Sequence, residues 1–302
     1  MTHPGHWGLS GAIRFTTVLL LLLVGANTDV TSPLVGVHVS SLNQSFESAN
    51  RAVSLQVPRR SVPLRAAPRP RRSQALMRKY ETSALMPDLS ISFKSQIAPA
   101  QPLFEEACTA FARGTLIPTV RGPVAIEDLL PGDYVESSAG AQPVTWIGST
   151  TYVPGVPDES TMLASLSRIT ADSFGPGRPM VDVVVGPAAH MVMQRDRLKS
   201  LIGRETVLVP VADFTDGDRI VEVAPVGSVQ LFHLMLGRHA TMRIGGIEME
   251  SYHPGTSLGR AMGESTAALF LSLFPNIGQA EDFGELSLTR TKREVIDSLT
   301  SR

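Results

Sequence analysis

The chain has 302 residues, of which 43% are hydrophobic and 18% are charged, so it can build one large domain or two modest ones with a buried core. The formal net charge of -1 hides an asymmetry: residues 1–76 hold eight Arg, no Lys and two acidic side chains, about +6, whereas residues 77–302 hold 19 basic and 26 acidic side chains, about -7. A mildly acidic body argues against a nucleic-acid partner, and the single Cys excludes an internal disulfide framework and a Cys-rich zinc site.

The N-terminal region contains one strongly apolar run, at residues 17–26. The run is shorter than the roughly 20 apolar residues that cross a bilayer, and with Arg14 before it and small residues after it, it resembles the apolar core of a signal peptide. Residues 27–72 are rich in Ser, Val, Pro and Arg without periodicity, which indicates disorder. We predict a disordered basic region over 1–76; alternatively, the natural chain begins at Met77, where the composition changes.

Two features of the sequence bear on the cellular location of the protein, and they indicate different compartments. A single Cys suits a reducing compartment, so the cytoplasm is favoured. A secreted or membrane-anchored protein is the alternative, and we expect membrane contact only if residues 15–26 act as a signal or an anchor.

The middle of the chain alternates short β-branched stretches with turns, which is the pattern of an all-β fold. After a connecting segment at 77–103, the expected strands are residues 116–120, 134–137, 142–148, 180–185 and 219–223. Between them, Leu130-Pro131-Gly132-Asp133 reads as a tight turn, with Gly132 at a positive φ and Asp133 accepting backbone N–H bonds. Gly245-Gly246 is predicted to form a hairpin turn. From about Leu258 the apolar spacing becomes helical, so residues 258–302 are predicted to be a helical C-terminal extension that packs on the β body.

Four motifs in this region carry a family resemblance. They are Phe111-Ala112-Arg113-Gly114-Thr115, Leu130-Pro131-Gly132-Asp133, Gly237-Arg238-His239 and Glu250-Ser251-Tyr252-His253-Pro254-Gly255. Together they resemble the Hint superfamily, the self-processing fold of hedgehog autoprocessing domains and inteins, and are most similar to bacterial Hint-domain proteins. The resemblance covers residues 104–257 and implies a mainly β, Hint-like fold.

Hint chemistry places strict demands on two positions. A Cys or Ser at the first residue of the domain attacks the preceding carbonyl, and a His protonates the departing amide nitrogen. The residue in register before Phe111 is Ala110, which has no nucleophile. The only Cys, Cys108, lies two residues upstream, a displacement of ~6–7 Å along an extended chain. His190 lies where the histidine belongs, but Pro187 occupies the place of the usual Ser or Thr.

Two functions remain open at this point. The first is a degenerate Hint domain that acts as a non-catalytic scaffold or interaction module for an unknown protein partner. The second is a self-processing domain in which Cys108 and His190, with His239 as a further candidate, cleave the Ala107–Cys108 bond; the only enzymatic activity would then be autocatalytic. An intein is disfavoured because the chain contains no His-Asn pair. We expect no cofactor and no metal, since the spacings of His233, His239 and His253 match no short ligand pattern.

Overall fold

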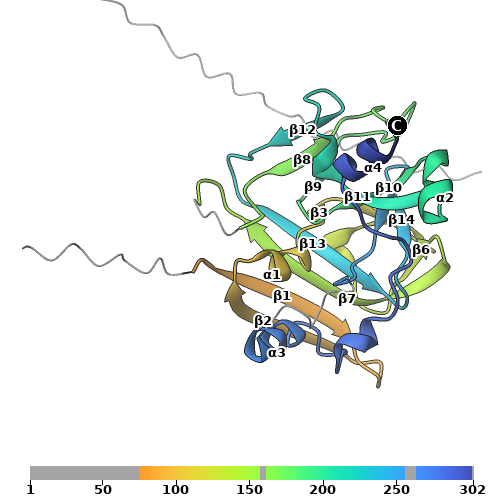
Figure 1. Cartoon of the computed structure of the whole chain (residues 1–302). Coiled ribbons are helices and arrows are strands. Elements are labelled where there is room, and N and C mark those ends of the chain that lie inside the picture. The colour runs from red at the N-terminus through yellow and green to blue at the C-terminus, as the bar shows by residue number, and fades with distance from the viewer. Residues whose placement is uncertain (1–74, 157–160, 256–262, 301–302) are drawn as a thin grey trace, which may run out of the picture. The chain divides into compact units, whose positions relative to one another are not determined.

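The computed structural model describes residues 75–156, 161–255 and 263–300 (Figure 1). Every described residue belongs to the compact unit Pro68–Arg302. Apart from Ala75 and Leu76, the predicted disordered region with its apolar run lies outside the described residues. Within the described ranges, no helix is long and apolar enough to cross a membrane.

The fold is mainly β, as predicted, and its strands form two sheets. The strands of the larger sheet are β1 (Met77–Leu85), β2 (Ile91–Pro99), β3 (Phe111–Ala112), β4 (Leu116–Thr119), β5 (Gly122–Ala125), β6 (Tyr134–Ser137), β7 (Gly140–Tyr152), β8 (Leu166–Ile169), β9 (Val183–Val185), β12 (Ile220–Val223) and β13 (Val229–Leu236). The strands of the smaller sheet are β10 (His190–Gln194), β11 (Thr206–Pro210), β14 (Thr241–Ile244) and β15 (Ile247–Glu250).

Short helices connect and cover these sheets. The α-helices are α1 (Pro102–Glu106), α2 (Asp196–Ile202), α3 (Glu264–Leu271) and α4 (Arg293–Thr300), and the 3-10 helices are η1 (Ile126–Asp128), η2 (Val211–Phe214) and η3 (Ala280–Phe283).

The larger sheet follows the order β12-β8-β9-β3-β13-β7-β6-β4-β5, and the smaller one follows β11-β10-β15-β14. The long strands β7 and β13 pair antiparallel from Val229 opposite Tyr152 to Leu236 opposite Val144 and form the centre of the larger sheet. In β13 the residues from Leu231 to Leu236 are all buried, which is why this strand contains a near-continuous apolar run rather than a strict alternation. This arrangement places the start of the matched motifs, β3, directly beside β13.

Residues 77–103 contribute a hairpin to the larger sheet, which corrects the sequence-based expectation of a connecting segment. β1 and β2 form an antiparallel hairpin, and β1 also pairs with β7, with Glu81 opposite Ser149 and Ala84 opposite Trp146. Tyr80 and Ala84 are fully buried on its inner face. The alternation in β1 has period two, but its pairing partner lies more than 60 residues along the chain, so the local pattern alone did not reveal it.

The predicted tight turn is confirmed. Gly132 has φ 102°, a conformation that glycine adopts without the steric cost of a side chain. The Asp133 carboxylate accepts a 2.9 Å hydrogen bond from the Leu130 backbone N–H, so the turn is closed by the side chain that was expected to close it. A second predicted turn, Gly245-Gly246, joins β14 to β15, with both glycines at positive φ.

The predicted strand at 180–185 is shorter than expected. Only Val183–Val185 are extended, and Met180 and Val181 are exposed by 79% and 67%. The preceding residues instead form a loop in which the Asp182 carboxylate accepts the Ala171 N–H. An apolar run is therefore a poor guide here, because half of it lies in a loop at the surface.

The C-terminal extension packs on the β body, as predicted. Beside α3, the Leu273 carbonyl accepts a 2.7 Å hydrogen bond from the Trp146 indole, and Phe274 stacks on the same ring with centroids 4.4 Å apart. α3 lies next to β2 in Figure 1, where the Ser272 hydroxyl bonds the Gln96 side chain. At the other end of the extension, α4 buries Ile296 against α2 and β11.

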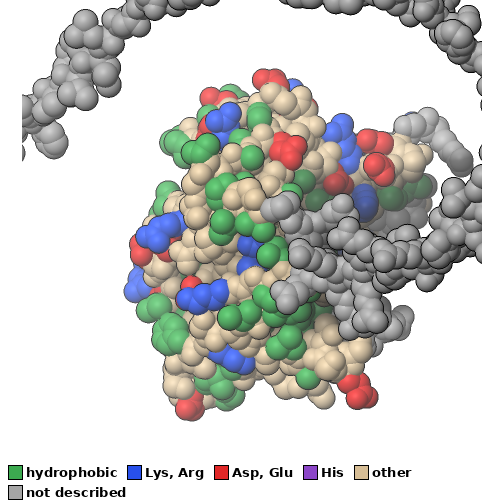
Figure 2. Space-filling model, turned by 90° about the vertical axis from the view of Figure 1, so that its left-hand side faces the viewer, with side chains coloured by type: hydrophobic (Ala, Val, Ile, Leu, Met, Phe, Trp, Pro, Cys, Tyr) green, Lys and Arg blue, Asp and Glu red, His purple; other side chains and the backbone are tan. Residues whose placement is uncertain are grey.

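Not every apolar side chain finds a partner. Phe93 and Ile97, on one face of β2, are exposed by 71% and 67%. Figure 2 shows hydrophobic side chains exposed among Lys and Arg side chains over one face of the molecule.

Candidate functional site

The residue where the nucleophile was expected lies inside the larger sheet. Ala110 is fully buried and immediately precedes β3. Its N–H donates to the Phe232 carbonyl at 3.0 Å, and its carbonyl accepts the Gly186 N–H at 2.9 Å. Both backbone groups of Ala110 are therefore held between β13 and the end of β9.

The peptide carbonyl before Ala110 faces the loop that carries His190. The Thr109 carbonyl accepts a 3.2 Å hydrogen bond from the Ala188 N–H. Gly186 has no side chain at this contact, and a Cβ built there would lie 2.1 Å from the Thr109 oxygen, well inside any van der Waals distance. The close approach thus requires glycine at 186. Sequence reasoning missed Gly186 and Thr109, because a lone Gly gives no signal of which distant carbonyl it contacts.

His190 is the first residue of β10 and is half-buried. Its Nδ1 lies 3.0 Å from the Ala188 carbonyl and 3.2 Å from the Glu250 carboxylate. Since both partners are acceptors, Nδ1 carries the proton. Burial lowers the pKa of His190, and the nearby Glu250 charge only partly offsets this, so the ring is neutral at pH 7. Among the described contacts, neither ring nitrogen reaches the Thr109–Ala110 peptide.

Cys108 lies in a different environment from His190. It follows the C-terminal end of α1, where its N–H donates to the Glu105 carbonyl at 2.9 Å. The side chain is fully buried beside Trp146 and Gly148, and a Cβ on Gly148 would meet the Cys108 sulfur at 2.7 Å. Burial raises the pKa of the Cys108 thiol well above its ordinary value, so the thiolate is strongly disfavoured. No contact in the described part of the chain joins this sulfur to His190.

His239 belongs to a buried polar network around Glu250. The His239 Nε2 lies 2.9 Å from one Glu250 oxygen, and its Nδ1 accepts the Ser287 backbone N–H at 3.0 Å, with the Ser287 hydroxyl at 2.8 Å. Accepting at Nδ1 fixes the tautomer with the proton on Nε2, which donates to Glu250. Arg290 adds bonds of 2.9 and 3.0 Å to the two Glu250 oxygens.

The charge state of Glu250 follows from these neighbours. Burial raises the pKa of Glu250, but the hydrogen bond from His239 and the charge of Arg290 outweigh it, and the net pKa is below its usual value. The carboxylate is therefore ionised and links His190 and His239 to the C-terminal segment that carries Ser287 and Arg290. The sequence named His239 as a further candidate and Glu250 as part of a motif, but it gave no sign that the two are bonded, because the partners of Glu250 come from three separate segments.

The remaining histidines do not gather into a metal site. His233 donates from Nδ1 to the Glu106 carbonyl at 3.0 Å, and burial lowers its pKa to about 4. His253 bonds the Gly284 carbonyl at 3.1 Å and receives the Gly255 N–H on its other nitrogen. Over the described ranges, no group of three or more His, Cys, Asp or Glu side chains is arranged to hold a metal ion.

Comparison with known proteins identifies one domain. Residues 109–256 match a family described as the Hint domain. No curated protein matches the chain. An intein-like domain from Clostridium thermocellum is similar at 16% identity and a TM-score of 0.34, covering 48% of this chain and 99% of its own.

Two further solved structures are similar over the same share of the chain. The gp41-1 intein is 11% identical with a TM-score of 0.30, covering 47% of this chain and 98% of its own. The MchDnaB-1 intein is 15% identical with a TM-score of 0.28, covering 47% of this chain and 100% of its own.

Proposed function

The chain is a Hint-domain protein, and we propose that its Hint domain is a non-catalytic scaffold or interaction module in which the self-processing chemistry has been lost. The observation that carries the proposal is the residue at position 110. The Thr109 carbonyl, which a nucleophile at this position would attack, accepts a hydrogen bond from the loop that leads to His190. Ala110 offers no atom to attack it, so the domain retains the close approach without the reactive group.

The chain upstream of this position supports the same proposal. In a processing domain, the segment before the nucleophile is the part released by cleavage. Here that segment supplies β1 to the larger sheet and buries Tyr80, Phe104 and Cys108 in one cluster with Trp146. A segment that contributes core side chains suits a permanent part of the fold better than a leaving product.

The alternative is self-cleavage through Cys108. Its sulfur would attack the Ala107 carbonyl carbon, and the proton that the thiol loses would pass by way of His190 to the departing Cys108 nitrogen as the C–N bond breaks. Water would then hydrolyse the thioester. The buried thiol with its raised pKa and the helix hydrogen bond of the Cys108 N–H both oppose this route.

Intact mass of the full chain under denaturing conditions tests the proposal. Denaturation is needed because β1 pairs with β7, so a cleaved N-terminal fragment would stay bound in native buffer. We expect the parent, Cys108→Ala and His190→Ala to show the same uncleaved mass, with or without hydroxylamine or excess thiol. A fragment beginning at Cys108 in the parent, absent in Cys108→Ala, would refute the scaffold proposal and establish the alternative.

Restoring the lost groups gives a second, independent test. Ala110→Cys alone should stay uncleaved, because Pro187 leaves the loop without the hydroxyl that accompanies the histidine in active relatives. Ala110→Cys combined with Pro187→Thr should cleave slowly before position 110 in the presence of thiol, if the loss of chemistry lies in these two residues. Cleavage by the single variant would show that Pro187 is no obstacle.

A further inference from the structure

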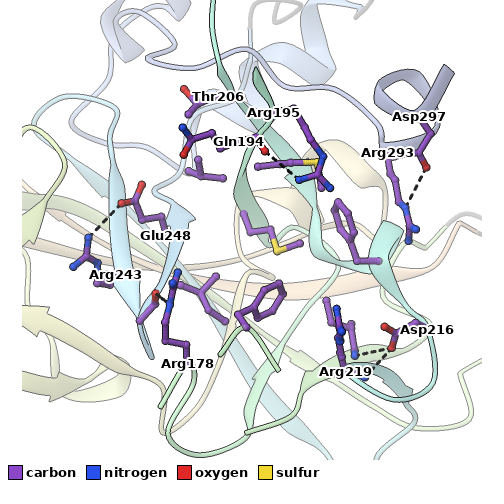
Figure 3. Close-up of a pocket in the computed structure, with 18 residues that line it drawn as sticks. Arg178, Gln194, Arg195, Thr206, Asp216, Arg219, Arg243, Glu248, Arg293 and Asp297 are labelled. Atoms are coloured by element: carbon purple, nitrogen blue, oxygen red, sulfur yellow. Dashed lines mark hydrogen bonds and ion pairs between the residues drawn. The ribbon is translucent and has the colours of Figure 1, made fainter. Parts of the chain in front are cut away.

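Strands β10 and β15 pair at one position and then separate. Within the described residues their only register pair is Met191 with Met249, whereas β10 pairs with β11 along its whole length and β15 pairs with β14 along its whole length. Beyond Met191, residues 192–194 of β10 and 246–248 around the start of β15 line a groove of about 990 Å³ (Figure 3). The two strands therefore no longer pair with each other where the groove begins.

Part of the groove lining is apolar. Met191, Met193, Phe214, Ile220 and Ile247 contribute to it, and Phe174 lies at its edge, 36% exposed. Methionine side chains adapt to ligands of varied shape because they are flexible and polarisable. The lining thus suits apolar side chains of a partner rather than one rigid molecule.

Arginines surround this apolar centre. Arg178, Arg195, Arg219, Arg243 and Arg293 line the groove together with only three carboxylates, from Asp216, Glu248 and Asp297, and Figure 3 shows the charged side chains arranged around the opening. The excess of positive charge lies on a body that is acidic as a whole, about -7 over residues 77–302. The groove is therefore a local positive site that the overall charge does not explain.

Three of these guanidinium groups are available to a ligand. Arg243 and Arg293 form ion pairs with Glu248 and Asp297. In contrast, no ion pair joins Arg178, Arg195 or Arg219 to a carboxylate of the described chain, although the Asp216 carboxylate accepts the Arg219 backbone N–H at 2.8 Å. The side chains of the first two donate to backbone carbonyls: Arg178 Nε donates to Gly246 at 3.2 Å, and Arg195 Nη1 donates to Gln194 at 3.1 Å. These bonds hold the two arginines beside the strand ends and leave further N–H donors for bidentate contact with a carboxylate.

We propose that this groove binds an extended acidic peptide segment of another protein, which adds as a strand where β10 and β15 separate. An added strand takes main-chain hydrogen bonds from open strand edges, and its alternate side chains point to opposite faces. Apolar residues then contact the Met and Phe lining, and the Asp or Glu residues between them pair with Arg178, Arg195 and Arg219. A nucleic acid fits less well, because three carboxylates lie among the arginines and would repel its phosphates. The inference rests on the proposed interaction role and names the chemistry of the partner.

The test measures binding of a fluorescein-labelled hexapeptide of alternating Asp and Leu to the full chain by fluorescence anisotropy. Two control peptides isolate the contributions: one replaces Asp by Lys, and one replaces the central Leu by Pro, which removes a main-chain donor and disfavours a strand. We expect binding of the Asp-Leu peptide only, weakened by added salt. No saturation of that peptide up to about 1 mM, a weak affinity on the usual scale, would overturn the proposal, and so would equal binding of the Pro peptide.

Two double variants, each of which removes two arginine charges, test whether the peptide binds in the groove. Arg195→Ala with Arg219→Ala should weaken the Asp-Leu peptide about tenfold, since two partly exposed ion pairs of this kind are lost. Arg113→Ala with Arg121→Ala removes the same charge from exposed positions outside the groove and should leave binding unchanged. Equal loss in both pairs, or displacement of the peptide by an oligothymidylate at equal concentration, would overturn the proposal. Intact mass of the same samples is measured in parallel, so failed peptide binding and unexpected self-cleavage are told apart.

Discussion

The close approach of Gly186 to the Thr109 carbonyl gives the most direct test of the geometry at the start of the domain. In Gly186→Ala, the new Cβ would lie 2.1 Å from the carbonyl oxygen and 3.2 Å from a Leu231 methyl group. An ordinary contact begins at 3.4 Å, so the two segments must separate by more than an ångström. The atom in the way is backbone, held by the Ala188 N–H, and cannot rotate aside.

The expected cost is that of overpacking, about 1–3 kcal/mol, which lowers the melting midpoint by roughly 2–12 °C for a domain of this size. Gly237→Ala is the matched control, because its Cβ would meet only ordinary contacts at 3.6 Å or more. Hydrogen exchange adds a local readout: the Gly186 and Ala188 amides, which bond Ala110 and Thr109, should exchange faster in Gly186→Ala alone. If both variants have the melting midpoint of the parent and these amides stay protected, the close contact between Gly186 and the Thr109 carbonyl is refuted.

Three further predictions concern other parts of the molecule. Gly132→Val should lose about 1–3 kcal/mol in urea denaturation, because a β-branched residue is strained at φ 102°; parent-like unfolding would contradict the turn. Deleting residues 1–74 should leave the thermal midpoint within about 4 °C of the parent, whereas deleting 1–100 removes the hairpin and should abolish cooperative unfolding; equal behaviour of the two truncations would show that the hairpin is dispensable. Because burial depresses the pKa of His233 to about 4, its stabilising contribution is present above pH 6.5 and is lost as the pH falls towards 4, when the unfolded chain takes up the proton. His233→Phe should therefore reduce the loss of stability between pH 7 and pH 4.5 by about 2–3 kcal/mol, and an unchanged loss would assign the titration to other groups.

The sequence predicts best what local chemistry determines. The turn at Gly132 and Asp133 and the hairpin at Gly245 could be predicted because each depends on a few adjacent residues. Glycine adopts a positive φ readily, and the Asp133 carboxylate accepts a nearby backbone N–H. The helical C-terminal extension could be predicted from the helical spacing of its apolar residues. The pairing of β1 with β7 could not be predicted, because a strand's partner depends on the whole sheet and not on the strand's own alternation.

The candidate site also has features that could be predicted from the sequence and features that could not. His190 and His239 were named as candidates because each occupies a position that the family resemblance singles out. The sequence did not reveal that they share Glu250 as a partner, since Glu250 receives bonds from β10, from the segment after β13 and from Arg290 near the C-terminus. The apolar groove also escapes the sequence, because nothing in β10 or β15 indicates that the two strands separate after one pair.

The position of Cys108 bears on the proposal that the domain has lost its processing chemistry. A reactive thiol needs access to solvent and a stabilised thiolate, and Cys108 has neither, since it packs against Trp146 as a small apolar side chain would. Next to it, the Thr109 hydroxyl donates to the Glu105 carbonyl at 2.9 Å, and β3 pairs with β13, so the chain is held on both sides of the Thr109–Ala110 peptide. Cleavage of that peptide would separate the N-terminal hairpin, which contributes buried side chains, from the rest of the larger sheet, and this favours the scaffold proposal.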